Sequence, residues 1–355
     1  MERQVLRGQV PKGRVKTLFG TSAGMDDLLK TVSEDGALFQ YLSHELRQNK
    51  DLVLAAVSQN GGYLRYAGSS AKSDRDLVMV AVSSNGFALE HASHDLRDDR
   101  EVVLEAVKRD GESLMFASPF LREEKEIVLE AVNENGWALG YAGSHRADKE
   151  VVLTSVSRNG YAIQLAGYHL KGDKDVVHAA VLNDGCALQY AFDHLKEDRE
   201  IVLSAVANDG LSLRYAGSQL RSDPEIVLAA MAENCQSFYY AHSNLKSNKN
   251  FVFEAMKKYK VAFSYADYDL RQDPDLVLYN FLRMKLFFAL RKQLLTLQHE
   301  TLQDFTLHIL DLIRNDPDTP NVICDMASKL IDKAFHPVHG SARKRDRDEF
   351  EREWI

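Results

Sequence analysis

Histidine and carboxylate side chains near the C-terminus are the first candidates for chemistry in this 355-residue sequence. His336 and His339 form a close pair, and Asp325 and Asp332 precede them. A proline interrupts the pair and no carboxylate follows it at helical spacing, so the pair lacks the further ligands that a zinc site needs. We therefore predict no metal ion here. An enzyme that uses these four residues is kept as an alternative.

Five other histidines recur at the same or an adjacent position of a repeated segment. Stacked repeats would bring them into a row that resembles a ladder of metal ligands. However, Pro119, Ser218 and Asn244 occupy equivalent positions and are not ligands of that kind. We interpret these histidines as loop-capping residues. They are His44, His94, His145, His169 and His194.

The recurring glycines do not form a phosphate site. Phosphate-binding loops need several glycines close together so that backbone amides can surround the phosphate. The glycines of this sequence, such as Gly86 and Gly136, recur singly at the ends of predicted helices. We therefore predict no catalytic residue, no cofactor and no enzymatic activity.

The elements that would position any site belong to a repeat, which a row of alanines marks. Successive alanines are 25 residues apart, with one interval of 24. A fixed period of this length indicates stacked structural repeats. Around each alanine the same phrase returns: an acidic residue, three aliphatics, Ala-Val, Asn-Gly or Asp-Gly, then Leu-x-Tyr-Ala. The alanines are Ala67, Ala92, Ala117, Ala142, Ala166, Ala191, Ala216, Ala241 and Ala266.

Each repeat is predicted to be a hairpin of two short helices. An Asp or Asn such as Asp99 precedes the first helix, where its side chain can cap the free amides. Asn-Gly or Asp-Gly after a helical run is typical of a helix that ends at a glycine in the left-handed conformation. The alanine of the second helix is predicted to be a close-contact position between hairpins. Such short helices are not stable alone, so the hairpins must stack.

These patterns predict an all-α fold, a right-handed superhelical α-solenoid of about ten 25-residue helical hairpins with a C-terminal helical cap. Residues 1–25 are predicted to be a basic N-terminal segment and 26–275 the helical-repeat solenoid. Residues 276–335 would form the cap, and 336–355 a charged tail.

Composition narrows the class of partner and the compartment. The net charge of −8 argues against nucleic acid as the main partner. Three cysteines without framework spacing indicate a reducing compartment. The N-terminus lacks the apolar region of a secretory signal peptide, and no apolar run is long enough to span a membrane. A monomer is expected.

The variable positions of the repeat are the candidate binding site. One set directly follows the glycine and the other follows three residues later, so both lie on one side of the second helix. Stacking would align them into a strip that reads an extended protein or peptide, with large apolar side chains as anchors. The alternative is that these side chains only fill gaps between repeats. The predicted partner-binding residues are Arg65, Phe87, Trp137, Tyr161, Gln164, Leu211, Arg214 and Tyr239.

The repeated phrase resembles the repeats of domain of unknown function 4116, over roughly residues 26–275. The resemblance implies a protein of the kind found in algae and in bacteria that live inside eukaryotic cells, several of which look like secreted effectors. That family has no assigned chemistry, so no catalytic residue is carried over. The tail, with Glu349, Glu351 and Glu353, resembles the export signals of type IV secretion effectors.

The resulting prediction is a non-enzymatic scaffold that binds another protein, as a bacterial effector that acts on a host protein. It would be located in the cytoplasm or delivered to a host cytosol. One alternative places an enzyme activity in residues 276–355, with the solenoid as the substrate-binding part. The other is a purely structural repeat protein with no dedicated partner.

Overall fold

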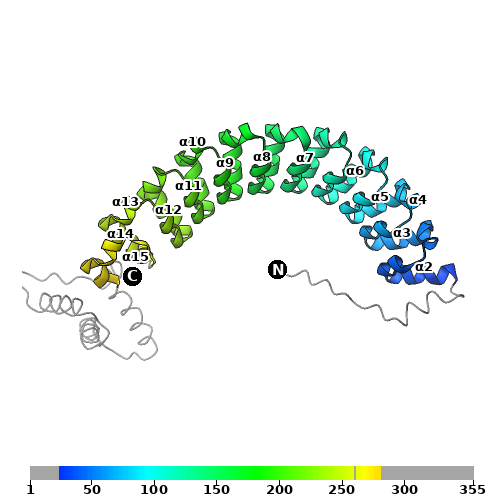
Figure 1. Ribbon diagram of the computed structural model, residues 1–355, viewed down its shortest axis with the longest axis horizontal. Helices are drawn as coiled ribbons and strands as arrows, with labels where there is room; N and C mark the ends of the chain where they lie inside the picture. The colour runs from blue at the N-terminus through cyan, green and yellow to red at the C-terminus, as the bar shows by residue number, and fades with distance from the viewer. Residues whose placement is uncertain (1–23, 260, 281–355) are drawn as a thin grey trace, which may run out of the picture. The chain divides into compact units, whose positions relative to one another are not determined.

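The computed structural model describes residues 24–259 and 261–280, and these are helical apart from short connections (Figure 1). Their contacts form two compact units, which meet in sequence at Asn208 and Asp209 and are described separately below. The all-helical, tandem-repeat prediction is confirmed for the described residues. Most of the predicted N-terminal segment and C-terminal cap, and the whole tail with His336 and His339, lie outside them.

Each repeat contains three helical segments, one more than the hairpin prediction gives. In one repeat of the first unit these are the α-helix α5 (Arg75–Ser84), the 3-10 helix η4 (Gly86–His91) and the short turn η5 (Leu96–Asp98). We call them the opening helix, the 3-10 helix and the third segment. The hairpin prediction does not include the third segment, because it counts only the helix after the Asp or Asn cap and the helix that carries the alanine.

The first unit repeats this order along the chain. Its opening helices are α2 (Met25–Glu34), α3 (Lys50–Gln59), α5, α6 (Arg100–Arg109), α7 (Lys125–Glu134), α8 (Lys149–Arg158), α9 (Lys174–Asn183) and α11 (Arg199–Asn208). Its 3-10 helices are η1 (Gly36–Tyr41), η3 (Gly61–Tyr66), η4, η6 (Gly111–Phe116), η8 (Gly136–Tyr141), η10 (Gly160–Leu165) and η12 (Gly185–Tyr190). Its third segments are η2 (Leu46–Gln48), α4 (Ser69–Lys72), η5, η7 (Leu121–Glu123), η9 (Gly143–Ala147), η11 (Tyr168–Gly172) and α10 (Asp193–Lys196).

The second unit has the same order of segments, and residues 274–280 continue it as a helix. Its elements are η13 (Gly210–Tyr215), η14 (Leu220–Ser222), α12 (Pro224–Glu233), η15 (Cys235–Tyr240), α13 (Ser243–Lys246), α14 (Lys249–Lys258), α15 (Ala262–Tyr265) and α16 (Tyr268–Arg271).

Equivalent segments of neighbouring repeats pack side by side. In the first unit the opening helices contact one another in chain order from α2 to α11, and the 3-10 helices do so from η1 to η12 (Figure 1). The core lies between these two rows. In α6 its members are Val102, Val103, Ala106 and Val107, which are fully buried. The aliphatic face of one opening helix is therefore covered by the neighbouring repeats.

The predicted caps are present. The Asp99 carboxylate accepts from the amides of Glu101 at 3.0 Å and Val102 at 3.1 Å. The same side chain type caps most opening helices, because the first-turn amides have no partner within the helix.

The recurring glycines do not have the predicted left-handed conformation. Among the described residues, only Gly143 has a positive φ, of 51°. Asn135 is extended, and its side chain caps the 3-10 helix by accepting from the amide of Trp137. Gly136, which begins that helix, lies against the next repeat, where a Cβ atom would come 2.5 Å from the carbonyl oxygen of Ser155. Close approach of two backbones, not chain reversal, therefore requires glycine here.

The row of alanines is buried as predicted, from Ala142 at 0% exposure to Ala92 at 7%. The residue after the alanine then donates to the third segment of the preceding repeat. The amide of Ser93 bonds the Lys72 carbonyl at 2.8 Å, and that of Ser118 bonds the Arg97 carbonyl at 2.9 Å. A larger side chain at the alanine would separate the backbones that these hydrogen bonds join.

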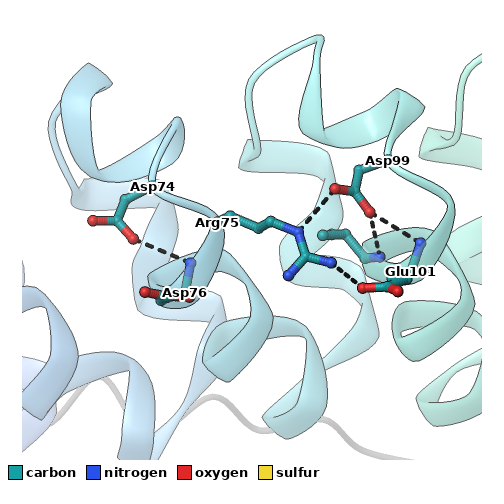
Figure 2. Close-up of polar contacts among 6 residues, drawn as sticks. Asp74, Arg75, Asp76, Asp99 and Glu101 are labelled. Atoms are coloured by element: carbon teal, nitrogen blue, oxygen red, sulfur yellow. Dashed lines mark hydrogen bonds and ion pairs between the residues drawn. The ribbon is translucent and has the colours of Figure 1, made fainter.

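Ion pairs connect the N-terminal ends of successive opening helices, and we call this series the ion ladder. Figure 2 shows one step: Arg75 Nε lies 2.9 Å from the Asp99 carboxylate, and the same guanidinium pairs with Glu101. Asp99 thus caps its own helix and also forms an ion pair with a cation of the preceding repeat. In the first unit the described cations of the ion ladder are Lys50, Arg75, Arg100, Lys125, Lys149 and Lys174.

The ion ladder shifts the ionisation of its members. The hydrogen bond from Lys50 lowers the pKa of Asp74. Hydrogen bonds to Asp198 and Glu200 raise the pKa of Lys174 to about 12. In the second unit Lys249 pairs with Asp273 at 2.9 Å in the same way.

Candidate partner-binding strip

The geometry of the 3-10 helix decides which residues face outward. This helix has about three residues per turn, so residues three apart lie directly above one another. In η8 the first and fourth residues, Gly136 and Leu139, are buried, while the third and sixth, Ala138 and Tyr141, are buried and half-buried. The second residue, Trp137, lies on the remaining side and is 37% exposed. The second and fifth residues are therefore the outer positions of this helix and of the other 3-10 helices, except that Cys186, the second residue of η12, is buried.

In the first unit, five of the predicted binding residues occupy outer positions. Arg65 on η3 is exposed, and Phe87 on η4 is 40% exposed. Trp137 follows on η8, and Tyr161 and Gln164 on η10 are half-buried. Because these 3-10 helices pack in chain order, the five residues lie along one row, which we call the binding strip.

Met115 on η6 fills a place in the binding strip between Phe87 and Trp137, and it is also 40% exposed. It stands at a variable position of the repeat but was left out of the predicted residues. A thioether side chain adapts easily to different apolar partners. With Met115 included, the binding strip is continuous from Phe87 to Trp137.

The second unit carries the other three predicted residues. Leu211 is half-buried and Arg214 exposed on η13, and Tyr239 on η15 is 61% exposed. These two helices pack against each other. The second unit therefore has its own short row of outer positions.

Rings at the outer positions also pack against the following repeat. Phe87 meets Phe116 edge to face with 6.1 Å between ring centroids, and Tyr161 meets Tyr190 in the same way at 6.0 Å. Edge-to-face contacts of this kind hold aromatic rings in place. Each ring thus fills part of a gap between repeats and still presents an exposed edge. This packing fits the gap-filling interpretation, and the partner-binding role of these residues stays a prediction.

Cations lie over the aromatic residue at the end of some 3-10 helices. The Arg65 guanidinium is 4.9 Å from the ring centroid of Tyr66. In the second unit Arg214 lies 4.5 Å from that of Tyr215. These cation–π contacts orient both arginines along their rings.

The predicted site omitted a row of basic residues in the third segments, which we call the basic row. Their signal was present in the sequence, since Lys or Arg follows the leucine of nearly every third segment. Four of these side chains in the first unit donate to carbonyls at the ends of the 3-10 helices, as Lys72 does to Arg65 at 3.1 Å. The basic row therefore borders the binding strip. In the first unit it comprises Arg47, Lys72, Arg97, Arg122, Arg146, Lys171 and Lys196.

The predictions about metal sites and a C-terminal enzyme activity stay predictions. Residues 24–259 and 261–280 contain no group of three or more His, Cys, Asp or Glu side chains that could hold a metal ion. Among the recurring histidines, the His145 ring lies 2.8 Å from the Glu123 carbonyl oxygen. Over the same residues, no helix has the length and apolar character needed to cross a bilayer. Asp325, Asp332, His336 and His339 lie outside the described residues.

Comparison with known proteins gives one finding. The family model described as Domain of unknown function (DUF4116) matches more than half of the chain, in eight successive segments. No curated protein and no solved structure matches the chain. The matched segments are residues 26–70, 58–97, 74–122, 99–145, 124–171, 148–196, 173–221 and 223–271.

Proposed function

Since the chain belongs to the family of the domain of unknown function DUF4116, we propose that it is a non-enzymatic repeat scaffold that binds a protein or peptide. In this proposal the repeats form a right-handed superhelical α-solenoid, and the partner lies along the binding strip. The observation that supports it most directly is the row of partly exposed large side chains. Phe87, Met115 and Trp137 follow one another on neighbouring 3-10 helices.

The 3-10 helices combine positions with the same residue type in most repeats and positions whose residue type varies. Gly136 and Leu139 stand at buried positions that have glycine and leucine in most repeats. The outer positions change from Phe87 to Trp137 to Tyr161. Packing against the following repeat accepts different ring types at these positions, and large aromatic side chains tend to dominate protein interfaces. The variation at the outer positions is consistent with a surface that binds a partner.

The rings are also suited to binding because they are already positioned. Binding costs conformational entropy when side chains must be ordered. Phe87 and Tyr161 are held by edge contacts with the following repeat. They can therefore contact a partner with little further loss of freedom.

We extend the proposal to a secreted bacterial effector that binds a host protein and acts in the host cytosol. The support is the acidic tail with Glu349, Glu351 and Glu353, which resembles type IV export signals. The test is a translocation assay in which a reporter enzyme is fused before the full chain. Delivery into host cells that requires both the secretion system and residues 336–355 is expected. Retention of the fusion in the bacterium would refute this extension.

Affinity capture from a eukaryotic lysate tests the binding strip. The variant Phe87→Ala/Trp137→Ala/Tyr161→Ala removes three of its anchors. The control Leu54→Ala/Phe120→Ala/Leu182→Ala removes three exposed apolar side chains of the first unit that lie outside the strip. The strip variant should lose proteins that wild type and control both retain. Recovery of the same proteins by all three would show that the strip is not the binding surface.

A further inference from the structure

The first unit contains two rows of cations with different surroundings. The cations of the ion ladder pair with carboxylates of the next repeat, as Lys149 does with Asp173 at 2.8 Å. Four members of the basic row, Arg47, Lys72, Arg146 and Lys171, instead donate to backbone carbonyls. Within the described residues, Lys196 is its one member of the first unit with a carboxylate at ion-pair distance, Asp193 at 3.5 Å. Six positive charges beside the binding strip are therefore not neutralised by an ion pair.

Two of these cations converge on one turn of η10. Arg146 Nε donates to the carbonyl of Leu165 at 2.6 Å, and Lys171 Nζ donates to the adjacent carbonyl of Gln164 at 2.8 Å. They come from consecutive third segments, η9 and η11. The backbone thus holds two positive charges on either side of the same helix end.

Among residues 24–259 and 261–280, no carboxylate lies at ion-pair distance from either cation. Burial lowers the pKa of Lys171, and the charge of Arg146 lowers it further. The residue after each cation is also uncharged: Ala147 follows Arg146 and Gly172 follows Lys171, whereas acidic residues follow Arg97, Arg122 and Lys196. An anion bound between the two cations would relieve their mutual repulsion.

An aromatic ring that contacts two strip residues lies close to Lys171. Lys171 Nζ lies 6.0 Å from the ring centroid of Tyr190, whose edge contacts Tyr161. The Tyr190 hydroxyl is 3.3 Å from Gln164 Oε1. Positive charge, aromatic rings and a side-chain amide therefore meet at one place on the surface.

We propose that the Arg146–Lys171 pair binds a carboxylate of an extended acidic peptide that continues along the basic row and the binding strip. This proposal rests on the proposed function and names the chemical class of the partner. Packed helices lie about 8–10 Å apart, and a peptide in the polyproline II conformation advances about 3.1 Å per residue with three residues per turn, so every third side chain lies on the same face. An acidic side chain at about every third residue would therefore meet successive cations, and the residues between would contact the strip.

A peptide fits this surface better than a nucleic acid does. Asp98, Glu123 and Glu197 directly follow Arg97, Arg122 and Lys196 in the third segments. These carboxylates would repel a continuous phosphate backbone, whereas a peptide places its negative charges at intervals. The net charge of −8 acts in the same direction.

Fluorescence anisotropy with labelled synthetic peptides tests the proposal. The probe is a peptide of about fifteen residues with Glu at every third position and Phe and Ser between, at low ionic strength. Its controls are an isomer with all Glu residues in one block and a version with Gln in place of Glu. Wild type should bind the spaced peptide about tenfold more tightly than either control. Equal binding of the spaced and block peptides would overturn the proposed register.

The variant Arg146→Gln/Lys171→Gln should weaken binding of the spaced peptide about tenfold, because glutamine can still donate to the two carbonyls but carries no charge. The control Lys108→Gln/Arg109→Gln removes two exposed cations of α6 and should leave binding unchanged. Arg146→Lys/Lys171→Arg keeps both charges and should retain binding. Equal loss in the two glutamine pairs would overturn the site.

Circular dichroism establishes that each variant is folded. If Arg146→Gln/Lys171→Gln is unfolded, the salt dependence of wild-type binding decides, since charge-driven binding must weaken as salt rises. Binding of polyuridylic acid that needs Arg146 and Lys171, without binding of the spaced peptide, would overturn the proposal in favour of a nucleic acid.

The outcomes separate this proposal from the proposed function. If the strip variant loses captured proteins but no acidic peptide binds, the peptide class is wrong and the scaffold function stands. If the spaced peptide binds through Arg146 and Lys171 but the strip variant captures the same proteins as wild type, the cation site stands and the strip is wrong.

Discussion

Two surfaces of the first unit use the same repeat in opposite ways. Along the N-terminal ends of the opening helices, every described cation of the ion ladder meets a carboxylate, as Arg75 meets Asp99. Along the 3-10 helices, the outer residues change from repeat to repeat, and cations such as Arg146 donate to backbone carbonyls. The first surface satisfies its charges within the stack. The second leaves chemistry available to a partner.

The six residues of η8 include buried positions that pack within the stack and outer positions that face away from it. Leu139 and Gly136 belong to the packed framework, and Trp137 and Gly140 occupy the outer positions. Substitutions at the buried positions of this helix should lower the free energy of unfolding, and substitutions at its outer positions should change it little. The ion ladder provides further tests with smaller effects.

The largest difference is expected between Leu139→Ala and Trp137→Ala. Leu139 is fully buried, and its truncation should lower the free energy of unfolding by about 3 kcal/mol through lost contacts and a cavity. Trp137 is 37% exposed, and its truncation should cost less than about 1 kcal/mol while weakening partner capture. Urea unfolding followed by circular dichroism measures both. A loss for Trp137→Ala as large as that for Leu139→Ala would place Trp137 in the core.

The next effect concerns the two glycines of η8. Gly136→Ala should destabilise the protein by about 2 kcal/mol, because the new Cβ would come 2.5 Å from the Ser155 carbonyl oxygen of the next repeat. Gly140→Ala is the matched control, since its Cβ would meet only Leu165 Cδ1 at 3.5 Å, an ordinary contact. Its effect on the unfolding free energy should stay within about 0.5 kcal/mol. Similar values for the two variants would contradict the close-approach explanation.

Acid should weaken the ion ladder. The hydrogen bond from the lysine of the preceding repeat lowers the pKa of Asp74, Asp148 and Asp198. Such carboxylates stabilise the fold above their unfolded pKa of about 3.9, and this stabilisation is lost as the pH falls through the lowered folded values. Urea midpoints should be constant from about pH 8 to 5 and decrease below about pH 4.

The variant Asp74→Asn provides the control for the acid prediction. Asparagine caps an opening helix in this protein, as Asn49 does for α3, but it has no charge to lose. The acid-induced decrease should therefore be smaller in this variant than in wild type. A decrease that begins between about pH 8 and 5 would assign the pH dependence to groups other than the cap carboxylates.

The smallest effect is expected from Arg75→Gln, which removes one cation of the ion ladder. The melting temperature should decrease slightly at low salt and not at high salt, because exposed ion pairs contribute little and are screened. Lys108→Gln is the control, since the part of the chain that the structure describes shows no ion pair for Lys108. A loss for Arg75→Gln that persists at high salt would indicate that the arginine stem packs between repeats.

The sequence predicted the framework well because each framework residue recurs. The position of Asp99 is a helix cap in most repeats, that of Val102 is a buried aliphatic residue, and that of Ala92 is a buried alanine. Each of these roles depends on local spacing along one repeat. A period of 25 residues shows that spacing many times.

Features that depend on the neighbouring repeat were harder to predict. Asn-Gly is compatible with a left-handed helix end and with a close approach of backbones, and only the position of the Ser155 carbonyl decides for Gly136. Six residues of η8 are too few to separate a 3-10 period from an α-helical one. For the candidate site, the sequence indicated the outer positions but not the basic row. Lys and Arg are common in both cation rows, and coordinates are needed to show which ones meet a carboxylate.

The hydrogen bond from Ser93 to the carbonyl of Lys72 joins one repeat to its immediate neighbour, and so does the pairing of Arg75 with Asp99. A gene segment that encodes one repeat therefore carries both halves of each junction. Duplication of that segment would lengthen the protein without requiring any new complementary surface. Related proteins can thus contain different numbers of repeats, while each repeat packs against its neighbour through the same hydrogen bonds and ion pairs.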